Sequence, residues 1–280
     1  MIVQVLGSGD AFGSGGRFHT CFAVLRAGPG FLIDCGASAM ISVRRHGLDP
    51  NRIAAIVLTH LHGDHFGGLP FFILDAQLVS RRTSPLTIVG PHGLGARLET
   101  LMEASFPGSS RARRNFPLEV VEIEPEQPVH VPAAGAVVTG HAVDHPSGSP
   151  SLGLRLDCDG RVIAYTGDTA WTEAIVNIGR RADLLLAEAY CFERKTPFHL
   201  DFASLRERLA DIGAKKVVLT HMSPDMLSRD RASLAGCEPA EDGMVIEIPL
   251  ATARAGYRWS EFLIWQAKGL IVGLPAEATE

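Results

Sequence analysis

The stretch IVLTHLHGDHFGGLP, residues 56–70, turns from an apolar run into a cluster of polar side chains. Within a few positions the chain places three histidines and one aspartate, namely His60, His62, Asp64 and His65. Imidazole nitrogen and carboxylate oxygen are ligands that a zinc-like cation prefers, and the cation needs them to converge. Gly63 lets the backbone curl between them. Four such ligands on one short turn do not all reach one ion comfortably, so the loop predicts two ions side by side.

The remaining ligands are expected at the ends of other strands. AVDHPSG presents His145 where an apolar strand gives way to proline, and AYTGDTAW ends a strand just before Asp168. VVLTHMSP repeats the pattern of IVLTHLH, because an apolar strand is followed by threonine and then His221. A lone histidine at a strand end is more often an ordinary polar residue, but three such ends beside an HxHxDH loop favour a metal centre.

Composition limits the class of protein. The chain has 280 residues, of which 46% are hydrophobic and 20% charged, as in a globular domain. The net charge of −5 argues against a chain built to coat nucleic acid. No apolar run approaches the ~20 residues of a membrane span, and no signal peptide opens the chain, so a cytoplasmic protein is expected. The five scattered cysteines lack any CxxC and are expected to be reduced, structural thiols.

Apolar runs of four to eight residues, separated by turn residues, predict strands in two batches, over residues 1–92 and 118–166. Helix-bearing segments follow each batch. This order fits antiparallel sheets packed face to face with helices outside better than a purely parallel α/β fold. Residues 1–250 are expected to form one domain. Residues 251–280 are expected to form an apolar extension that packs on the domain or at a subunit interface, and a homodimer is one expectation.

HLHGDH resembles the signature of the metallo-β-lactamase fold, and the later His145, Asp168 and His221 match its further motifs in order. The resemblance runs from VLGSGDAF to EDGMVIEI, about residues 1–248. It implies an α+β fold, an αββα sandwich of two mixed sheets flanked by helices, with a dinuclear site at one edge. It also implies the ligands of each ion: His60, His62 and His145 for one; Asp64, His65 and His221 for the other; Asp168 bridging both.

The segment TGHAVDHPSG contains two histidines, His141 and His145, on the same strand face. The pattern of the family places the ligand at the end of the strand, before a turn rich in proline or serine. His145 meets this condition and His141 does not. His145 is therefore the expected ligand.

Two segments narrow the branch of the family. TIVGPHGL resembles the strand and turn of ribonuclease Z-like members, and the segment from 198 to 221 resembles one in which a histidine before a helix assists the leaving group. That histidine is His199 here, although a purely structural role at the helix start is the alternative. The tRNA-processing members carry a long arm between the third histidine ligand and the bridging aspartate. The 23 residues from His145 to Asp168 leave room for only one hairpin.

Two close cations generate hydroxide from water near neutral pH. The expected function is hydrolysis of a small or cyclic phosphodiester by such a metal-bound hydroxide, with Asp64 orienting it and His199 donating a proton. The alternative is a lactone, ester or thioester hydrolase. A non-catalytic scaffold or a flavin-coupled redox domain fits less well. Zinc is expected, with manganese or iron also compatible. The roles of His19, His141 and Arg111–Arg114 stay open.

Overall fold

The computed structural model describes residues 1–249. The predicted extension over residues 251–280, and the subunit interface suggested for it, lie outside the described residues. Fourteen strands form two seven-stranded sheets that face each other. All five cysteines are buried and unpaired. None of the helices within residues 1–249 has the length and hydropathy that crossing a bilayer requires.

The first sheet contains the N-terminal strand next to one edge. In spatial order its strands are β14 (Val245–Glu247), β1 (Ile2–Gly7), β2 (Cys21–Leu25), β3 (Gly30–Ile33), β4 (Ile53–Val57), β5 (Leu86–Pro91) and β6 (Leu118–Ile123). β1 pairs antiparallel with β14 and β2, whereas β3 to β6 run parallel. Every residue of β1 and β3 is buried, which explains why they are continuous apolar runs in the sequence.

The second sheet follows a related plan. Its strands in spatial order are β13 (Glu238–Pro239), β12 (Val217–Thr220), β11 (Leu184–Glu188), β10 (Arg161–Tyr165), β9 (Leu152–Cys158), β8 (Ala136–Ala142) and β7 (Val129–Val131). β7 to β10 are antiparallel, and β10 to β13 are parallel. β9 and β10 form a single hairpin that turns at Asp159 and Gly160, both with positive φ.

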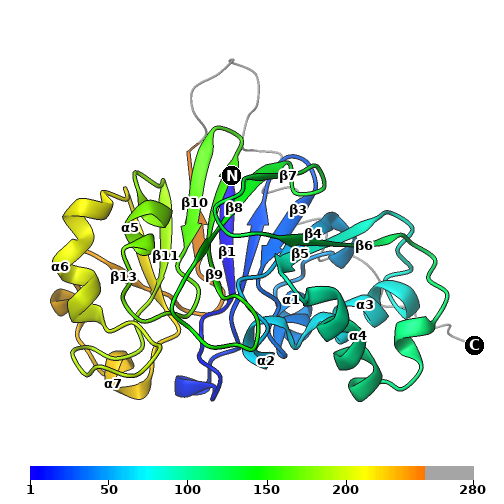
Figure 1. Cartoon of the computed structure of the whole chain (residues 1–280), viewed down its shortest axis with the longest axis horizontal. Helices are drawn as coiled ribbons and strands as arrows, with labels where there is room; N and C mark the ends of the chain where they lie inside the picture. The colour runs from blue at the N-terminus through cyan, green and yellow to red at the C-terminus, as the bar shows by residue number, and fades with distance from the viewer. Residues whose placement is uncertain (250–280) are drawn as a thin grey trace, which may run out of the picture.

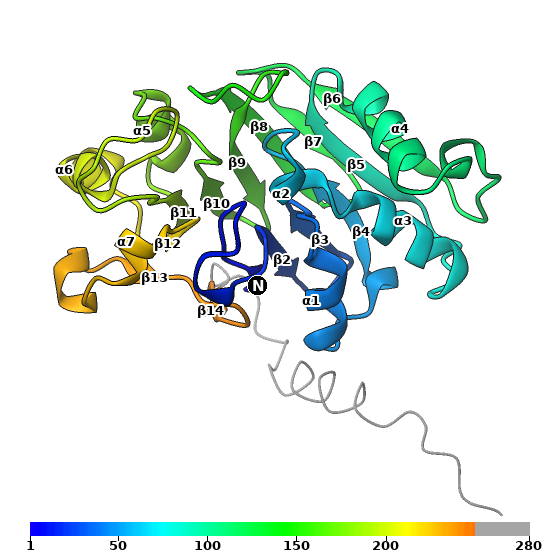
Figure 2. The same ribbon diagram turned by 90° about the horizontal axis from the view of Figure 1, so that it is seen from below.

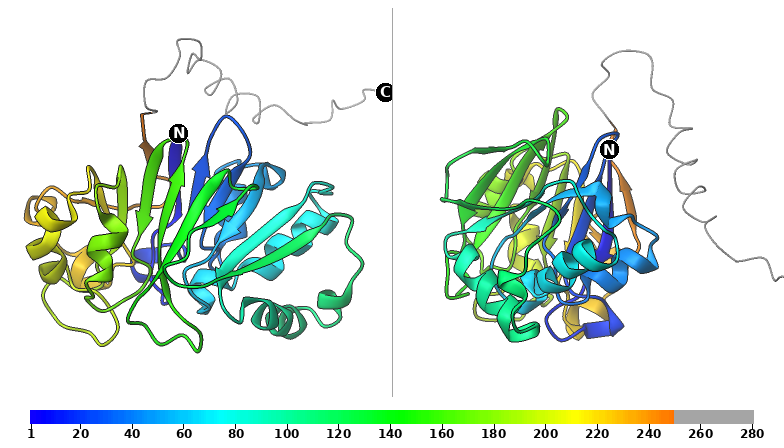
Figure 3. Two further views of the ribbon diagram at one scale, coloured as in Figure 1. Left: turned by 45° about the horizontal axis from the view of Figure 1, so that its top comes forward. Right: turned by 90° about the vertical axis from the view of Figure 1, so that its right-hand side faces the viewer.

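The helices cover the outer faces of the sheets. They are α1 (Ala39–Arg45), α2 (Gly63–Phe66), α3 (Leu69–Leu78), α4 (Leu94–Ser105), α5 (Ala174–Gly179), α6 (Phe202–Ile212) and α7 (Pro224–Leu227), with short 3-10 turns η1 (Ser14–Gly16), η2 (Pro50–Arg52), η3 (Ser109–Arg111) and η4 (Arg231–Leu234). α5 and α6 lie on one side of the strands and α3 and α4 on the other (Figures 1 and 2). The left panel of Figure 3 shows the same separation of yellow-green from cyan helices. The predicted αββα sandwich of two mixed sheets is confirmed.

The expectation of antiparallel sheets was wrong for half of each sheet. Helices α1, α3 and α4 follow strands of the first sheet and return the chain so that the next strand runs in the same direction. α6 does the same between β11 and β12, where the Asp201 side chain accepts a hydrogen bond from the Ser204 amide and Gly213 ends the helix with a φ of 61°. Parallel strands bring their carboxyl ends to a common edge, and that edge carries the polar cluster.

The core between the sheets is apolar. Phe22 on β2 meets Tyr165 on β10 edge to face, with ring centroids 5.4 Å apart. Leu152, Leu154 and Leu156 alternate along β9 and all face this core. Because both sheets are anchored by this packing, the loops at their common edge project from a rigid base.

Candidate metal centre

The predicted donor side chains meet at the edge formed by the carboxyl ends of the strands. His60 follows β4, Asp168 follows β10 and His221 follows β12, while His145 follows β8. The structure brings the seven predicted donors into two neighbouring groups, in each of which the ligand atoms lie within 4.8 Å of one another. A third group of the same kind joins Asp168 and His221 to Glu188 and His199. We call His60, His62 and His145 the histidine group, and Asp64, His65, Asp168 and His221 the mixed group.

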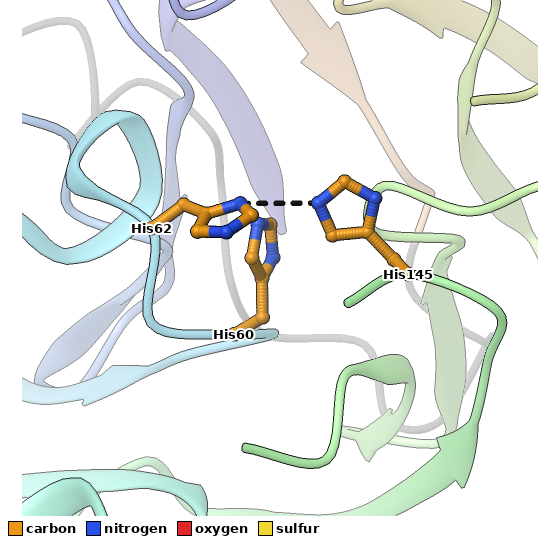
Figure 4. Close-up of side chains that lie close together, drawn as sticks. All are labelled: His60, His62 and His145. Atoms are coloured by element: carbon orange, nitrogen blue, oxygen red, sulfur yellow. Dashed lines mark hydrogen bonds between the residues drawn. The ribbon is translucent and has the colours of Figure 1, made fainter. Parts of the chain in front are cut away.

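The histidine group combines two halves of the molecule. His60 and His62 lie on the loop after β4, and His145 approaches from the opposite sheet (Figure 4). His62 Nδ1 and His145 Nε2 are 3.1 Å apart. Two nitrogens bound to one tetrahedral zinc at about 2.0–2.1 Å lie about 3.3 Å from each other. The spacing in this group therefore suits one ion.

The mixed group is held together by close contacts between imidazoles and carboxylates. Asp168 Oδ2 lies 3.3 Å from His65 Nε2 and 3.2 Å from His221 Nε2. Asp64 Oδ2 lies 3.3 Å and 3.2 Å from the same two nitrogens. Asp168 Oδ2 is also 4.0 Å from His60 Nε2, so this carboxylate stands between the two groups.

Residues behind the donors fix the orientation of the rings. His65 Nδ1 contacts Asp34 Oδ2 at 2.7 Å, and Thr59 Oγ1 lies 2.9 Å from the same oxygen and 3.0 Å from His60 Nδ1. His145 Nδ1 donates to the carbonyl oxygen of Phe198 at 2.9 Å. In each ring the outer nitrogen has a partner, which leaves Nε2 to face the cluster. Asp34 was not predicted, although FLIDCG ends a strand in an acid just as other segments end in a ligand.

Glu188 is a second functional candidate that the sequence reasoning missed. It is fully buried at the end of β11, and its Oε1 lies 2.5 Å from His199 Nδ1 and 3.3 Å from His221 Nδ1. Its Oε2 accepts hydrogen bonds from the amides of Thr169 and Leu200. The His199 ring lies 5.1 Å from the His145 ring, so the predicted proton donor stands beside the donor groups.

The electrostatics differ between the two groups. Burial lowers the pKa of His60 well below its usual value, and burial beside His145 also lowers the pKa of His62. Burial opposes charge in the mixed group too, but the carboxylates dominate there: they raise the pKa of His65 strongly and that of His221 to about 10. These imidazoles in turn hold the pKa of Asp168 well below the usual range.

The donor atoms fit a divalent metal ion. His60 Nε2 and Asp168 Oδ1 are buried without a hydrogen-bond partner among the described residues, which is costly for polar atoms unless a further group satisfies them. Imidazole and carboxylate are the donor set of zinc, manganese and iron centres. The geometry and the chemistry of the donors both point to divalent metal binding.

Other predicted candidates lie elsewhere. His141 is on β8, where its Nδ1 contacts Glu126 at 2.7 Å, and it belongs to neither donor group. Arg114 donates to three backbone carbonyls around η3, so it supports its own loop, while Arg111 and Arg113 are exposed. The backbone of His19 pairs with that of Gly9, and its ring lies outside the donor groups.

Comparison with known proteins gives the family. The model of the beta-lactamase superfamily domain matches residues 30–222, more than half of the chain. The chain belongs to this superfamily. It is a metal-dependent hydrolase with the metallo-β-lactamase fold.

Individual relatives fit this assignment. Ribonuclease Z of Enterococcus faecalis is 25% identical, over 79% of this chain and 88% of the relative. The crystal structure of human tRNase Z, short form, is 29% identical with a TM-score of 0.69, over 89% of this chain and 100% of that chain. A structure titled a new diphosphatase from the PhnP family has a TM-score of 0.69 at 21% identity, over 89% and 98% of the two chains. This last likeness shows the fold alone.

Proposed function

We propose that the protein is a dinuclear phosphodiesterase that hydrolyses a small or cyclic phosphodiester. One ion would be held by the histidine group and the other by Asp64, His65 and His221, with Asp168 shared between them. The separation of the seven donors into two sets, with the Asp168 carboxylate between them, supports a count of two. Zinc is the expected metal, and manganese or iron would suit the same donors.

When bound, such ions lower the pKa of water and draw charge from the attacked phosphoryl group. The residues of the chain then supply orientation and protons. Asp64 lies at the centre of the mixed group with part of its surface still accessible. We assign it the role of orienting the attacking water.

His199 is proposed to protonate the leaving oxygen. Burial disfavours its charged form, but the hydrogen bond and the charge of Glu188 raise the pKa of His199, which favours the protonated ring that a proton donor requires. About a quarter of the side chain is exposed (23%), which leaves it accessible to a substrate. The Glu188–His199 pair is the observation that carries the phosphodiester assignment, because an alcohol leaving group needs a proton as the bond breaks.

A small substrate is supported by the β9–β10 hairpin of the second sheet. Between His145 and Asp168 the chain forms a short loop and then β9, a two-residue turn and β10, which leaves no room for an inserted arm that could grip a folded RNA. The net charge of −5 does not favour a long nucleic acid either. The relatives named ribonuclease Z nevertheless make an RNA the first competing substrate to test.

The test is a substrate panel with protein of known metal content. The panel contains bis(p-nitrophenyl) phosphate, a cyclic nucleotide, a tRNA precursor, a lactone and a thioester. We expect two ions per chain and fastest turnover of the small phosphodiesters. A protein that binds no zinc or manganese in excess would contradict the dinuclear proposal. Fastest turnover of the lactone or thioester would favour the carbonyl-ester alternative, and fastest cleavage of the tRNA precursor would replace the small substrate by RNA.

A further inference from the structure

A cavity of about 380 Å³ lies beside the histidine group. Leu61 forms part of its wall, and this residue stands between His60 and His62 in the chain. Ser147 forms another part and follows His145 by two residues. The cavity therefore borders the two loops that carry the histidine group.

A hydrogen bond connects the two facing walls of the cavity. One wall is the turn after β5 and the first part of α4; the other is the loop after His145. The Ser149 hydroxyl on one wall donates to the carbonyl oxygen of His92 on the other. The Ser147 hydroxyl, itself buried, donates to the carbonyl oxygen of Ser149 and lies 2.9 Å from Ser151 Oγ. These bonds hold the walls in place before any ligand arrives, which lowers the entropic cost of binding.

Arg97 gives the cavity a cation that is free to bind a ligand. Among the described residues its guanidinium has no hydrogen-bond or ion-pair partner. Glu122, the acid beside the start of α4, has other partners: its two carboxylate oxygens accept hydrogen bonds from the amides of Gly93 and Gly95, and His92 Nδ1 lies 3.2 Å from its Oε2. A free guanidinium in a preformed cavity suits phosphate, which it binds through paired hydrogen bonds.

The rest of the lining is partly apolar. Leu61, Ala96 and Pro150 offer apolar surface, and the volume lies within the range of small-molecule sites. A nucleoside or sugar matches this combination of apolar surface, hydroxyl groups and one cation.

We propose that this cavity binds one ester arm of the substrate and that Arg97 binds a second phosphate carried by that arm. The inference rests on the proposed phosphodiesterase function and narrows its substrate class: a diester with a phosphorylated nucleoside or sugar arm, as in a short oligonucleotide end. Arg97 acts here as a specificity residue and takes no part in the bond cleavage.

The experiment compares two chromogenic substrates that differ by one phosphate. Thymidine 5′-(p-nitrophenyl phosphate) has no second phosphate, and its 3′-phosphorylated counterpart does. In Arg97→Gln we expect KM for the 3′-phosphorylated substrate to rise roughly tenfold, since a charge-assisted contact is lost. The kcat for both substrates and KM for the unphosphorylated one should stay the same. Arg113→Gln, the same change at an exposed arginine away from the cavity, is the control and should alter neither KM.

A binding measurement separates this inference from the proposed function. Calorimetry with thymidine 3′,5′-bisphosphate and thymidine 5′-monophosphate needs no turnover. Arg97→Gln should weaken the bisphosphate by roughly tenfold and the monophosphate little. Ala96→Trp, on the exposed surface of α4, should fill the cavity and weaken both ligands.

Equal effects of Arg97→Gln on both ligands, or no effect of either variant, would overturn the inference. Failure of the wild-type protein to cleave any phosphodiester would instead overturn the proposed function. The calorimetric comparison would then still decide whether the cavity recognises the second phosphate.

Discussion

The histidine group and the mixed group lie side by side, yet they are prepared for a cation in opposite ways. In the histidine group, burial disfavours the charged forms of His60 and His62 and lowers the pKa of both. The mixed group contains two carboxylates that keep His65 and His221 protonated. The first group thus offers lone pairs at neutral pH, whereas the second is an internally neutralised cluster that must release protons before it binds a metal.

The comparison shows what the shared aspartate does. Asp168 contributes to the charge balance of the mixed group and also lies 4.0 Å from His60 Nε2. A cation in the mixed group would replace the positive charge of the imidazolium rings. The Asp168 carboxylate is therefore shared by the two groups, and a change at Asp168 should affect metal binding at both.

Asp168→Asn is expected to have the largest effect. It keeps the shape of the side chain but removes the charge, so both ions should be lost or weakly held and hydrolysis should fall by roughly 10³-fold or more. Metal analysis and initial rates provide the measurement. Asp157→Ala, at a half-exposed carboxylate on β9, is the control and should behave as wild type. Retention of both ions in Asp168→Asn would show that the groups are independent.

His145→Ala should remove one ion per chain and reduce hydrolysis by roughly 10²-fold or more, because the histidine group loses the only ligand that comes from the second sheet. His141→Ala, on the strand that leads to His145, serves as the matched change and should leave metal content and rate unaltered. The opposite outcome, with metal lost in His141→Ala and kept in His145→Ala, would reverse the assignment of the third histidine.

His199→Ala tests whether His199 supplies the proton to the leaving oxygen. It should keep both ions and slow an alkyl phosphodiester by roughly 10²-fold, with a much smaller effect on a nitrophenyl diester whose leaving group needs no proton. Glu188→Gln should act in the same direction by lowering the pKa of His199. A uniform loss on both substrates would assign His199 to substrate positioning instead.

The smallest effect concerns the metal-free protein. Raised pKa values mean that His65 and His221 stay protonated well above neutrality, whereas His60 and His62 stay neutral below their usual pKa. Side-chain NMR of the imidazole nitrogens between about pH 5 and pH 9 should show this difference. As pH falls, metal affinity of the mixed group should therefore fall first. If all four rings titrated with the ordinary histidine pKa of about 6.5, the two groups would not differ in protonation.

Much of this arrangement could be predicted from strand ends. The HxHxDH loop and the ends at His145, Asp168 and His221 are local signals, and the structure brings these side chains together. Asp34 and Glu188 end strands in the same way, but their partners are ring nitrogens, hydroxyl groups and amides elsewhere in the chain, and no sequence spacing marks such an acid. Arg97 could not be found, because its place in a cavity depends on how α4 packs beside a loop fifty residues later.

The left-handed backbone conformation of Phe198 limits how the loop that carries His199 can be redesigned. Its φ of 63° is strained for a residue with a side chain, and it turns the carbonyl oxygen towards His145 Nδ1. The surface loop that carries His199 thus also sets the tautomer of a candidate ligand on the other side of the centre. A loop graft intended only to change substrate range would have to keep this left-handed position, or it would disturb the metal along with the specificity. Glycine at 198 would be the most permissive choice in such a graft.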